Sequence, residues 1–141
     1  MKILIAVDGS AYSTKAVKHV IKHFNWFSSI PELHLLHVKL PLPSGGARSF
    51  LGSDMVNRYY EEESLAALAA SEKILKKKEI PFRSSWKVGD IPKEIQSYVK
   101  KNKIDLIVMG SHGHGAFTNL VMGSIATKVL ASTDVPVMIV R

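Results

Sequence analysis

The sequence predicts an α/β fold: a doubly wound, five-stranded parallel sheet in the order 3-2-1-4-5, with helices on both faces. Short aliphatic runs alternate along the chain with longer segments in which apolar residues recur every three or four positions. The aliphatic runs are nearly continuous, as in strands that are buried on both faces. Such an alternation, with right-handed crossovers, is typical of a mostly parallel sheet between two layers of helices.

Five segments have the character of strands. Most are continuous aliphatic runs, and the third alternates apolar and polar side chains. We expect strands over residues 2–7, 33–40, 82–88, 104–109 and 135–140. The first run resembles the start of a signal peptide, but Asp8 and Gly9 interrupt it at once and no cleavage site follows. It is better interpreted as a strand.

Helices are expected between these strands. Ser10, Asp54 and Asp90 each precede a segment with helical spacing, and their side chains can accept hydrogen bonds from free amides at a helix start. Pro92 suits the first turn of the third helix, where a missing N–H costs little. We expect helices over residues 11–27, from 54 to the lysines at 76–78, from 91, and over 124–131, with a loop at 41–53.

The composition indicates one globular domain over residues 1–141. Apolar residues make up 46% and charged residues 22% of the chain, which is ordinary for a folded protein. No apolar stretch approaches the roughly 18 residues of a membrane span, so we expect no membrane association. The absence of cysteine excludes disulfides and thiolate sites and is compatible with a cytoplasmic protein.

The net charge of +7 favours anionic partners, such as nucleotides or nucleic acids. The densest lysine groups, at residues 76–78 and 100–103, lie at the expected ends of helices, where cations interact favourably with the helix dipole. Because that explanation suffices and no recognition motif is present, a nucleic-acid-binding module is the less favoured interpretation.

Unusual residues follow two strands that the predicted order makes neighbours. The first strand ends in Asp8-Gly9-Ser10 and the fourth runs into a glycine-rich turn at residues 110–115. In such sheets ligands bind beyond the carboxyl ends of the strands, where the strand order reverses. Glycines there let backbone amides approach phosphate oxygens closely. The two turns therefore predict one crevice that binds an anion.

Gly123-Ser124 stands at the expected start of the last helix. Free amides and the positive end of the helix dipole attract anions there, and a serine hydroxyl adds a donor. The simpler explanation is that the glycines only make turns and that Ser124 only caps a helix. Either feature alone is weak, and together they favour a site for a nucleotide's phosphate chain.

The pattern Gly110-x2-Gly113-x9-Gly123-Ser124 resembles the nucleotide-binding signature of the universal stress protein family, in its ATP-binding branch. The opening ILIAVDGS, the turn at residues 89–92, the segment IDLIVMGSHG and the closing DVPVMIV are similar to that family and stand in its order. The resemblance covers essentially the whole chain. It implies an adenine nucleotide alpha-hydrolase-like fold and a nucleotide-dependent regulatory protein of the stress response.

The resemblance also implies roles for individual residues. Asp8 would hydrogen-bond the nucleoside, and the backbone of Val38 would meet the adenine. Met109 and Gly110 would lie along the ribose. The phosphates would be held by Gly113, Gly123, Ser124 and Ile125.

The ligand so implied is ATP, or ADP or AMP, with Mg²⁺ or Mn²⁺ carried on the phosphates. The family further implies a homodimer formed through the last strand, residues 135–140, and a protein partner that the sequence does not identify. An apolar edge strand invites such pairing. No catalytic residue and no protein ligand for a metal is predicted.

The alternative is an ATP-dependent nucleotidyl or phosphoryl transferase with slow hydrolysis. Against it, the chain lacks a Walker A lysine motif, and no carboxylate pair stands beside the glycine turn to hold a catalytic metal. We therefore expect a binding protein, with slow ATP hydrolysis at most.

Other polar residues are weaker candidates. His112 and His114 in the glycine turn are best interpreted as solvated, with His112 a minor candidate for a catalytic role or for phosphate contact. His19 and His23, one helical turn apart, lack an evident third ligand and favour a solvated face. A further hypothesis is that the loop at 44–52 closes over the triphosphate and that Arg48 reaches it; the alternative is a disordered loop with no role in binding.

Overall fold

The computed structural model describes residues 1–43, 47–115 and 122–141, and the side chains of 47–51 lie outside this description. The described residues form a five-stranded sheet in the order β3-β2-β1-β4-β5, with every neighbouring pair parallel. The predicted order 3-2-1-4-5 is therefore confirmed. The strands are β1 (Lys2–Ala6), β2 (Glu32–Lys39), β3 (Phe82–Val88), β4 (Leu106–Gly110) and β5 (Val137–Val140).

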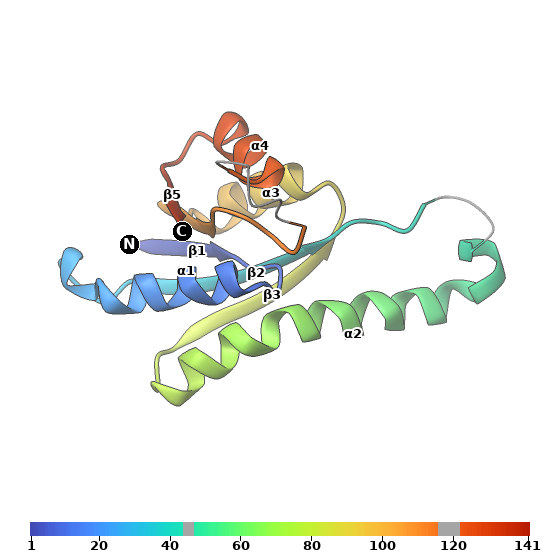
Figure 1. Cartoon of the computed structure of the whole chain (residues 1–141), viewed down its shortest axis with the longest axis horizontal. Helices are drawn as coiled ribbons and strands as arrows, with labels where there is room; N and C mark the ends of the chain where they lie inside the picture. Colours follow the sequence, from blue (N-terminus) through green and yellow to red (C-terminus); the bar gives the residue numbers. More distant parts are fainter. Residues whose placement is uncertain (44–46, 116–121) are drawn as a thin grey trace.

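Two layers of helices cover the sheet (Figure 1). One face carries α1 (Ala11–Lys22) and α2 (Ala47–Lys77), and the other carries α3 (Ile91–Asn102) and α4 (Ser124–Ser132). This is the doubly wound arrangement expected from the alternation of strands and helices. None of the described helices is both long and apolar enough to cross a lipid bilayer.

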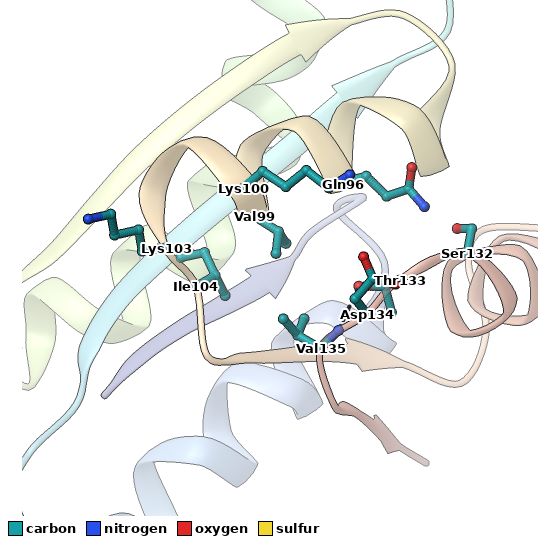
Figure 2. Close-up of a pocket in the computed structure, with 9 residues that line it drawn as sticks. All are labelled: Gln96, Val99, Lys100, Lys103, Ile104, Ser132, Thr133, Asp134 and Val135. Carbon is teal, nitrogen blue, oxygen red and sulfur yellow. Dashed lines mark hydrogen bonds between the residues drawn. The ribbon is translucent and has the colours of Figure 1, made fainter.

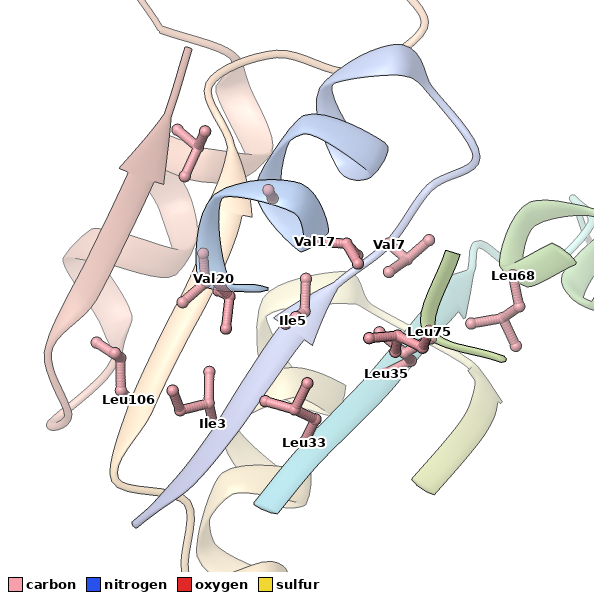
Figure 3. Close-up of a cluster of buried hydrophobic side chains, with 13 residues drawn as sticks. Ile3, Ile5, Val7, Val17, Val20, Leu33, Leu35, Leu68, Leu75 and Leu106 are labelled. Atoms are coloured by element: carbon pink, nitrogen blue, oxygen red, sulfur yellow. The ribbon is translucent and has the colours of Figure 1, made fainter. Parts of the chain in front are cut away.

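The core has two halves because side chains along a strand alternate between the two faces of the sheet. Ile3 and Ile5 point towards α1 and α2, as Figure 3 shows, whereas Leu4 points towards α3 and α4. All three are fully buried. Burial of each such side chain contributes about 1.5–3 kcal/mol. The continuous aliphatic runs of the sequence thus serve both halves at once.

The first helix ends earlier than the sequence predicted. It stops at Lys22 and a 3₁₀ turn follows at Phe24–Trp26, so the expected extent to residue 27 was wrong. His23 leaves the helical conformation, with φ −112° and ψ 27°. Its ring Nδ1–H donates to the carbonyl of His19 at 2.8 Å and so helps to terminate the helix.

The long helix α2 begins at Ala47, seven positions before the expected start at Asp54, so the expected loop at 41–53 was wrong from residue 47 on. Gly52 breaks this helix with a φ of 71° and a ψ of 159°. Glycine adopts such a positive φ readily. Asp54 therefore lies inside α2, just past the break, and not at its N-cap.

The other boundaries agree with the sequence-based expectations to within two residues. The caps at Ser10 and Asp90 are confirmed, because they accept hydrogen bonds from the amides of Ser13 at 3.4 Å and Lys93 at 3.2 Å. Lysines also occupy the last turns of α2 and α3, as expected.

Two buried histidines make the stability of the fold depend on pH. His34 donates to Glu32 at 3.0 Å and is hydrogen-bonded to the Tyr98 hydroxyl at 2.9 Å, while His37 donates to the Val7 carbonyl at 2.8 Å. Burial is the largest influence on each, and it lowers the pKa of both side chains below the ordinary value.

We expect the free energy of unfolding to fall when the pH is lowered from about 7.5 to about 5.5. Above about pH 6.5 these histidines are neutral in both states, and below it the unfolded chain binds protons more readily than the folded protein. Urea unfolding at a series of pH values measures this. His37→Asn should reduce the dependence, because its amide can donate to the Val7 carbonyl without titrating. Stability that stays level or rises over this interval would contradict the account.

Candidate functional site

A cavity of about 600 Å³ lies beyond the carboxyl ends of β1, β2 and β4, against the N-terminal ends of α3 and α4. It opens at the point where the strand order reverses, where ligands bind in sheets of this kind. All the site residues expected from the sequence line it: Asp8, Val38, Met109, Gly110, Gly113, Gly123, Ser124 and Ile125. The structure thus brings them together, while their roles stay predictions.

One half of the cavity is apolar. Val38 and Met109 come from the ends of β2 and β4, and Ile91 and Ile95 come from the first turns of α3. Together with Ile125 of α4, these residues form an apolar slot. Val38, Ile95 and Met109 are almost fully buried, so their positions are fixed by the core behind them. Such a lining suits a flat, weakly polar ring system.

The polar side of the cavity contains the carboxylate of Asp8. Its Oδ1 accepts hydrogen bonds from the Ser10 amide at 2.9 Å and from the Ser13 hydroxyl at 2.6 Å. Burial alone would raise the pKa of Asp8, but these hydrogen bonds outweigh it and hold the pKa below the ordinary value. Asp8 is therefore an anion at neutral pH.

The N-terminus of α4 faces the same cavity. Its N-cap is Gly123, which offers no side-chain hydrogen bond, and the helix proper begins at Ser124. The alternative that Ser124 caps this helix is therefore wrong. Amides in the first turn of a helix have no partner within it and favour anions. The amide of Gly123 itself donates to the Ser111 carbonyl at 2.7 Å, so Gly123 fixes the turn.

The three glycines of the turn after β4 differ in what surrounds them. A Cβ at Gly110 would lie 2.5 Å from the Cβ of Tyr12, so packing of α1 against the end of β4 requires glycine there. This packing is by itself a sufficient reason for glycine at position 110, and a part of Gly110 in the approach of a nucleotide stays a prediction. A Cβ at Gly113 would lie 2.6 Å from Oδ2 of Asp8, whereas one at Gly115 would meet no described residue within 4 Å.

The two histidines of the glycine turn also line the cavity. His114 is exposed, but its Nε2–H donates to the Asp8 carbonyl at 2.8 Å and ties the turn after β4 to the turn after β1. His112 is hydrogen-bonded to the Ser111 hydroxyl at 2.9 Å, and its ring lies 5.2 Å from that of Tyr12. The sequence-based interpretation of both histidines as merely solvated was therefore wrong.

Ser13 is the residue that sequence reasoning missed. It lines the cavity, is 3% exposed, and its hydroxyl contacts Asp8 twice. Its spacing of three residues from the N-cap Ser10, on the first turn of the helix, is the signal that could have revealed it. Arg48, which the sequence analysis placed over the phosphates, lies outside the described side chains.

The other weak candidates lie away from this cavity. His19 and His23 stack with Trp26, at centroid distances of 4.2 Å between the histidines and 4.0 Å between His23 and the indole. Within the described residues there is no group of three His, Cys, Asp or Glu side chains that could hold a metal. His34 is hydrogen-bonded to Tyr98 of α3, whereas His37 is hydrogen-bonded to the Val7 carbonyl after β1.

A smaller cavity of about 210 Å³ lies between the end of α3 and the turn that precedes β5 (Figure 2). Val99 and Ile104 form part of its apolar floor, and Thr133 and Asp134 lie opposite. It contains none of the expected site residues. It is therefore a weaker candidate for the functional site than the larger cavity.

The family model described as the universal stress protein family matches residues 1–141. The chain belongs to the universal stress protein family. The match spans every element that surrounds the large cavity, from β1 to β5.

Curated and solved relatives agree with this assignment. Universal stress protein MJ0531 of Methanocaldococcus jannaschii is 29% identical over 140 residues, which cover 99% of this chain and 81% of that protein. The solved structure of hypothetical protein MJ0577 is 27% identical with a TM-score of 0.76, and the match covers 99% of this chain and 94% of that one.

Two more distant universal stress proteins have been solved with nucleotides. One, from Archaeoglobus fulgidus, is in complex with dAMP; it is 19% identical with a TM-score of 0.66, and the match covers 100% of this chain and 98% of that one. The other, from Arabidopsis thaliana, has AMP bound; it is 16% identical with a TM-score of 0.68, covering 99% and 90%. At such identities the likeness shows the shared fold.

The packing at Gly110 gives a direct test of the site's architecture. Gly110→Ala should lower the stability of this universal stress protein by about 1–3 kcal/mol, because the new Cβ collides with Tyr12. Gly115→Ala is the matched control, since its Cβ would meet none of the residues that the structure describes within 4 Å. Its effect should stay within about 0.5 kcal/mol. Denaturant unfolding of both variants measures the difference, and equal stability would contradict the described approach of α1 to β4.

Proposed function

We propose that this chain, as one universal stress protein domain over residues 1–141, binds an adenine nucleotide in the large cavity, and that ATP is its ligand, as in the family's ATP-binding branch. The observation that carries the proposal is the convergence of an apolar slot, an ionised Asp8 and a helix N-terminus on one cavity. The bound AMP and dAMP of the two related structures support the choice of adenine.

In the proposed complex the base lies in the slot between Val38 and Ile95, with Met109 beneath the ribose. The phosphate chain extends along Gly113 to the first turn of α4, where Ser124 and the amide of Ile125 receive it. The distribution of apolar and polar groups around the cavity supports this direction of the ligand.

No lysine or arginine is among the described residues that line the cavity. Amides, the α4 dipole and the Ser124 hydroxyl therefore supply the positive potential, which leaves much of a triphosphate's charge uncompensated. Mg²⁺ or Mn²⁺ carried on the phosphates would supply the rest. The donor set fits an ion held chiefly by phosphate oxygens, since Asp8 is the one carboxylate among these lining residues and its Oδ1 is engaged by Ser10 and Ser13.

The same composition supports a regulatory protein over an enzyme. A nucleotidyl or phosphoryl transferase would need carboxylates to hold catalytic metal ions, and Asp8 is the one carboxylate in the described lining. A general base would have to be His112 or His114, and both rings are hydrogen-bonded within the protein, to the Ser111 hydroxyl and to the Asp8 carbonyl. In the regulatory proposal, ATP binds two states of the protein with different affinity and so shifts the population that a protein partner recognises in the cytoplasm during stress.

We further propose that the protein is a homodimer through β5. This strand stands at the edge of the sheet and consists of four apolar residues, of which three are half-buried. An apolar edge presents unpaired amides and carbonyls that a second copy can satisfy.

A charge placed at the α4 N-terminus tests the phosphate end of the site. Ser124→Asp should weaken ATP binding at least about tenfold by charge repulsion while leaving adenosine affinity unchanged. The fold should be retained, because Ser124 is exposed and acidic residues suit the first turn of a helix. Titration calorimetry with ATP, AMP and adenosine measures the effect.

Ala131→Asp is the matched control, since it adds the same charge two turns further along α4, at an exposed residue outside the cavity lining. Its ATP affinity should be close to that of the unmodified protein. Unmodified protein that binds neither ATP nor adenosine would refute the proposed function. Loss of adenosine affinity in Ser124→Asp would refute the assignment of the phosphates to α4.

A further inference from the structure

We infer that Ser13 is a positioning residue for the nucleoside end of the cavity: its hydroxyl holds the carboxylate of Asp8 where a donor group of adenosine meets it. The inference rests on the proposed function and assigns Ser13 a part in it. The ligand group it serves is an N–H or O–H donor, such as the exocyclic amino group of adenine or a ribose hydroxyl.

The Ser13 hydroxyl makes two hydrogen bonds with one residue. It donates to Oδ1 of Asp8 at 2.6 Å and accepts from the backbone amide of Asp8 at 2.9 Å. A hydroxyl has one donor and two acceptor positions, so both bonds can form together. Ser13 is buried in the first turns of α1, and its own position is therefore fixed by the helix.

The two carboxylate oxygens of Asp8 are used differently. Oδ1 accepts from Ser13 and also from the Ser10 amide at 2.9 Å. Oδ2 lies on the side of Gly113, where a Cβ would approach it to 2.6 Å. Asp8 and Gly113 both line the cavity. The carboxylate is thus anchored through one oxygen and presents the other near the glycine turn, which lowers the entropic cost of binding a donor there.

Ser13 also helps to lower the pKa of Asp8. Burial raises the pKa of Asp8, and hydrogen bonds from Ser10 and Ser13 lower it by more. Among the described residues, the titratable groups that act on Asp8 are His114, from the turn after β4, and His37, from β2. Removing the Ser13 hydroxyl takes away a donor to the charged form, so the pKa of Asp8 should rise.

The experiment uses adenosine, which has no phosphate and so reports on the nucleoside end alone. Adenosine affinity is measured by calorimetry between about pH 7 and about pH 4, and the pKa of Asp8 by the carbon-13 shift of its carboxyl group in the ligand-free protein. The variants are Ser13→Ala and Ser13→Thr, which retains a hydroxyl. Thr14→Ala is the control, because the exposed Thr14 hydroxyl donates to the Ala11 carbonyl and does not contact Asp8.

Ser13→Ala should weaken adenosine binding about three- to tenfold at neutral pH, as expected for loss of one hydrogen bond that orients the binding group. The pKa of Asp8 should rise, and the loss of affinity at acid pH should begin at a higher pH than in the unmodified protein. Ser13→Thr should restore both properties towards the unmodified values. Thr14→Ala should change neither.

An unchanged pKa of Asp8 in Ser13→Ala would overturn the inference, and so would a raised pKa with unchanged adenosine affinity. Equal loss of affinity in Ser13→Ala and Ser13→Thr would also overturn it, because the hydroxyl would then not be the cause. These outcomes require that the unmodified protein binds adenosine. If it binds neither adenosine nor ATP, the proposed function fails first and takes this inference with it.

Discussion

The parallel pairing of β1 with β4 is the interaction on which the site depends. Ile3 to Ala6 pair in register with Leu106 to Met109, although about a hundred positions separate them in the chain. Both strands run in the same direction and end together, so the turns that follow them lie side by side. Asp8 and Gly113 face each other for this reason, and His114 closes the junction through the Asp8 carbonyl.

The register in turn depends on the core. Ile5 and Leu4 are fully buried on opposite faces of β1, so a slip by one residue would exchange the two faces. The same packing forms the apolar half of the cavity. Val38, Met109 and Ile95 belong to the core between the sheet and the layer of α3 and α4, and they also line the apolar slot. Stability and binding surface are therefore supplied by the same side chains.

The cavity separates two kinds of charge. Asp8 brings a negative charge to the end of β1, and α4 brings the positive end of its dipole from the other side. A nucleotide matches this arrangement, because a nucleoside offers hydrogen-bond donors and its phosphates offer negative charge. A ligand in the reverse orientation would place phosphate against the carboxylate. The polarity of the site thus favours one direction for the proposed nucleotide.

Much of the fold and of the site could be predicted from the sequence, because both depend on the spacing of apolar residues and on the positions of glycines. Aliphatic runs such as residues 2–7 and 104–109 revealed the strands, and the glycine spacing placed the residues that now line one cavity. Features that depend on contacts between distant side chains could not be predicted. The reason for glycine at Gly110 is Tyr12, the helix break at Gly52 follows from a backbone conformation, and the role of Ser13 emerges only when Asp8 is seen beside it.

A crystal structure of the protein grown with ATP and Mg²⁺ tests the central claim most directly. The account predicts adenine in the slot between Val38 and Ile95, a nucleoside donor on Asp8, and phosphates at the first turn of α4. Nucleotide density elsewhere on the molecule, or phosphates directed towards Asp8, would contradict it.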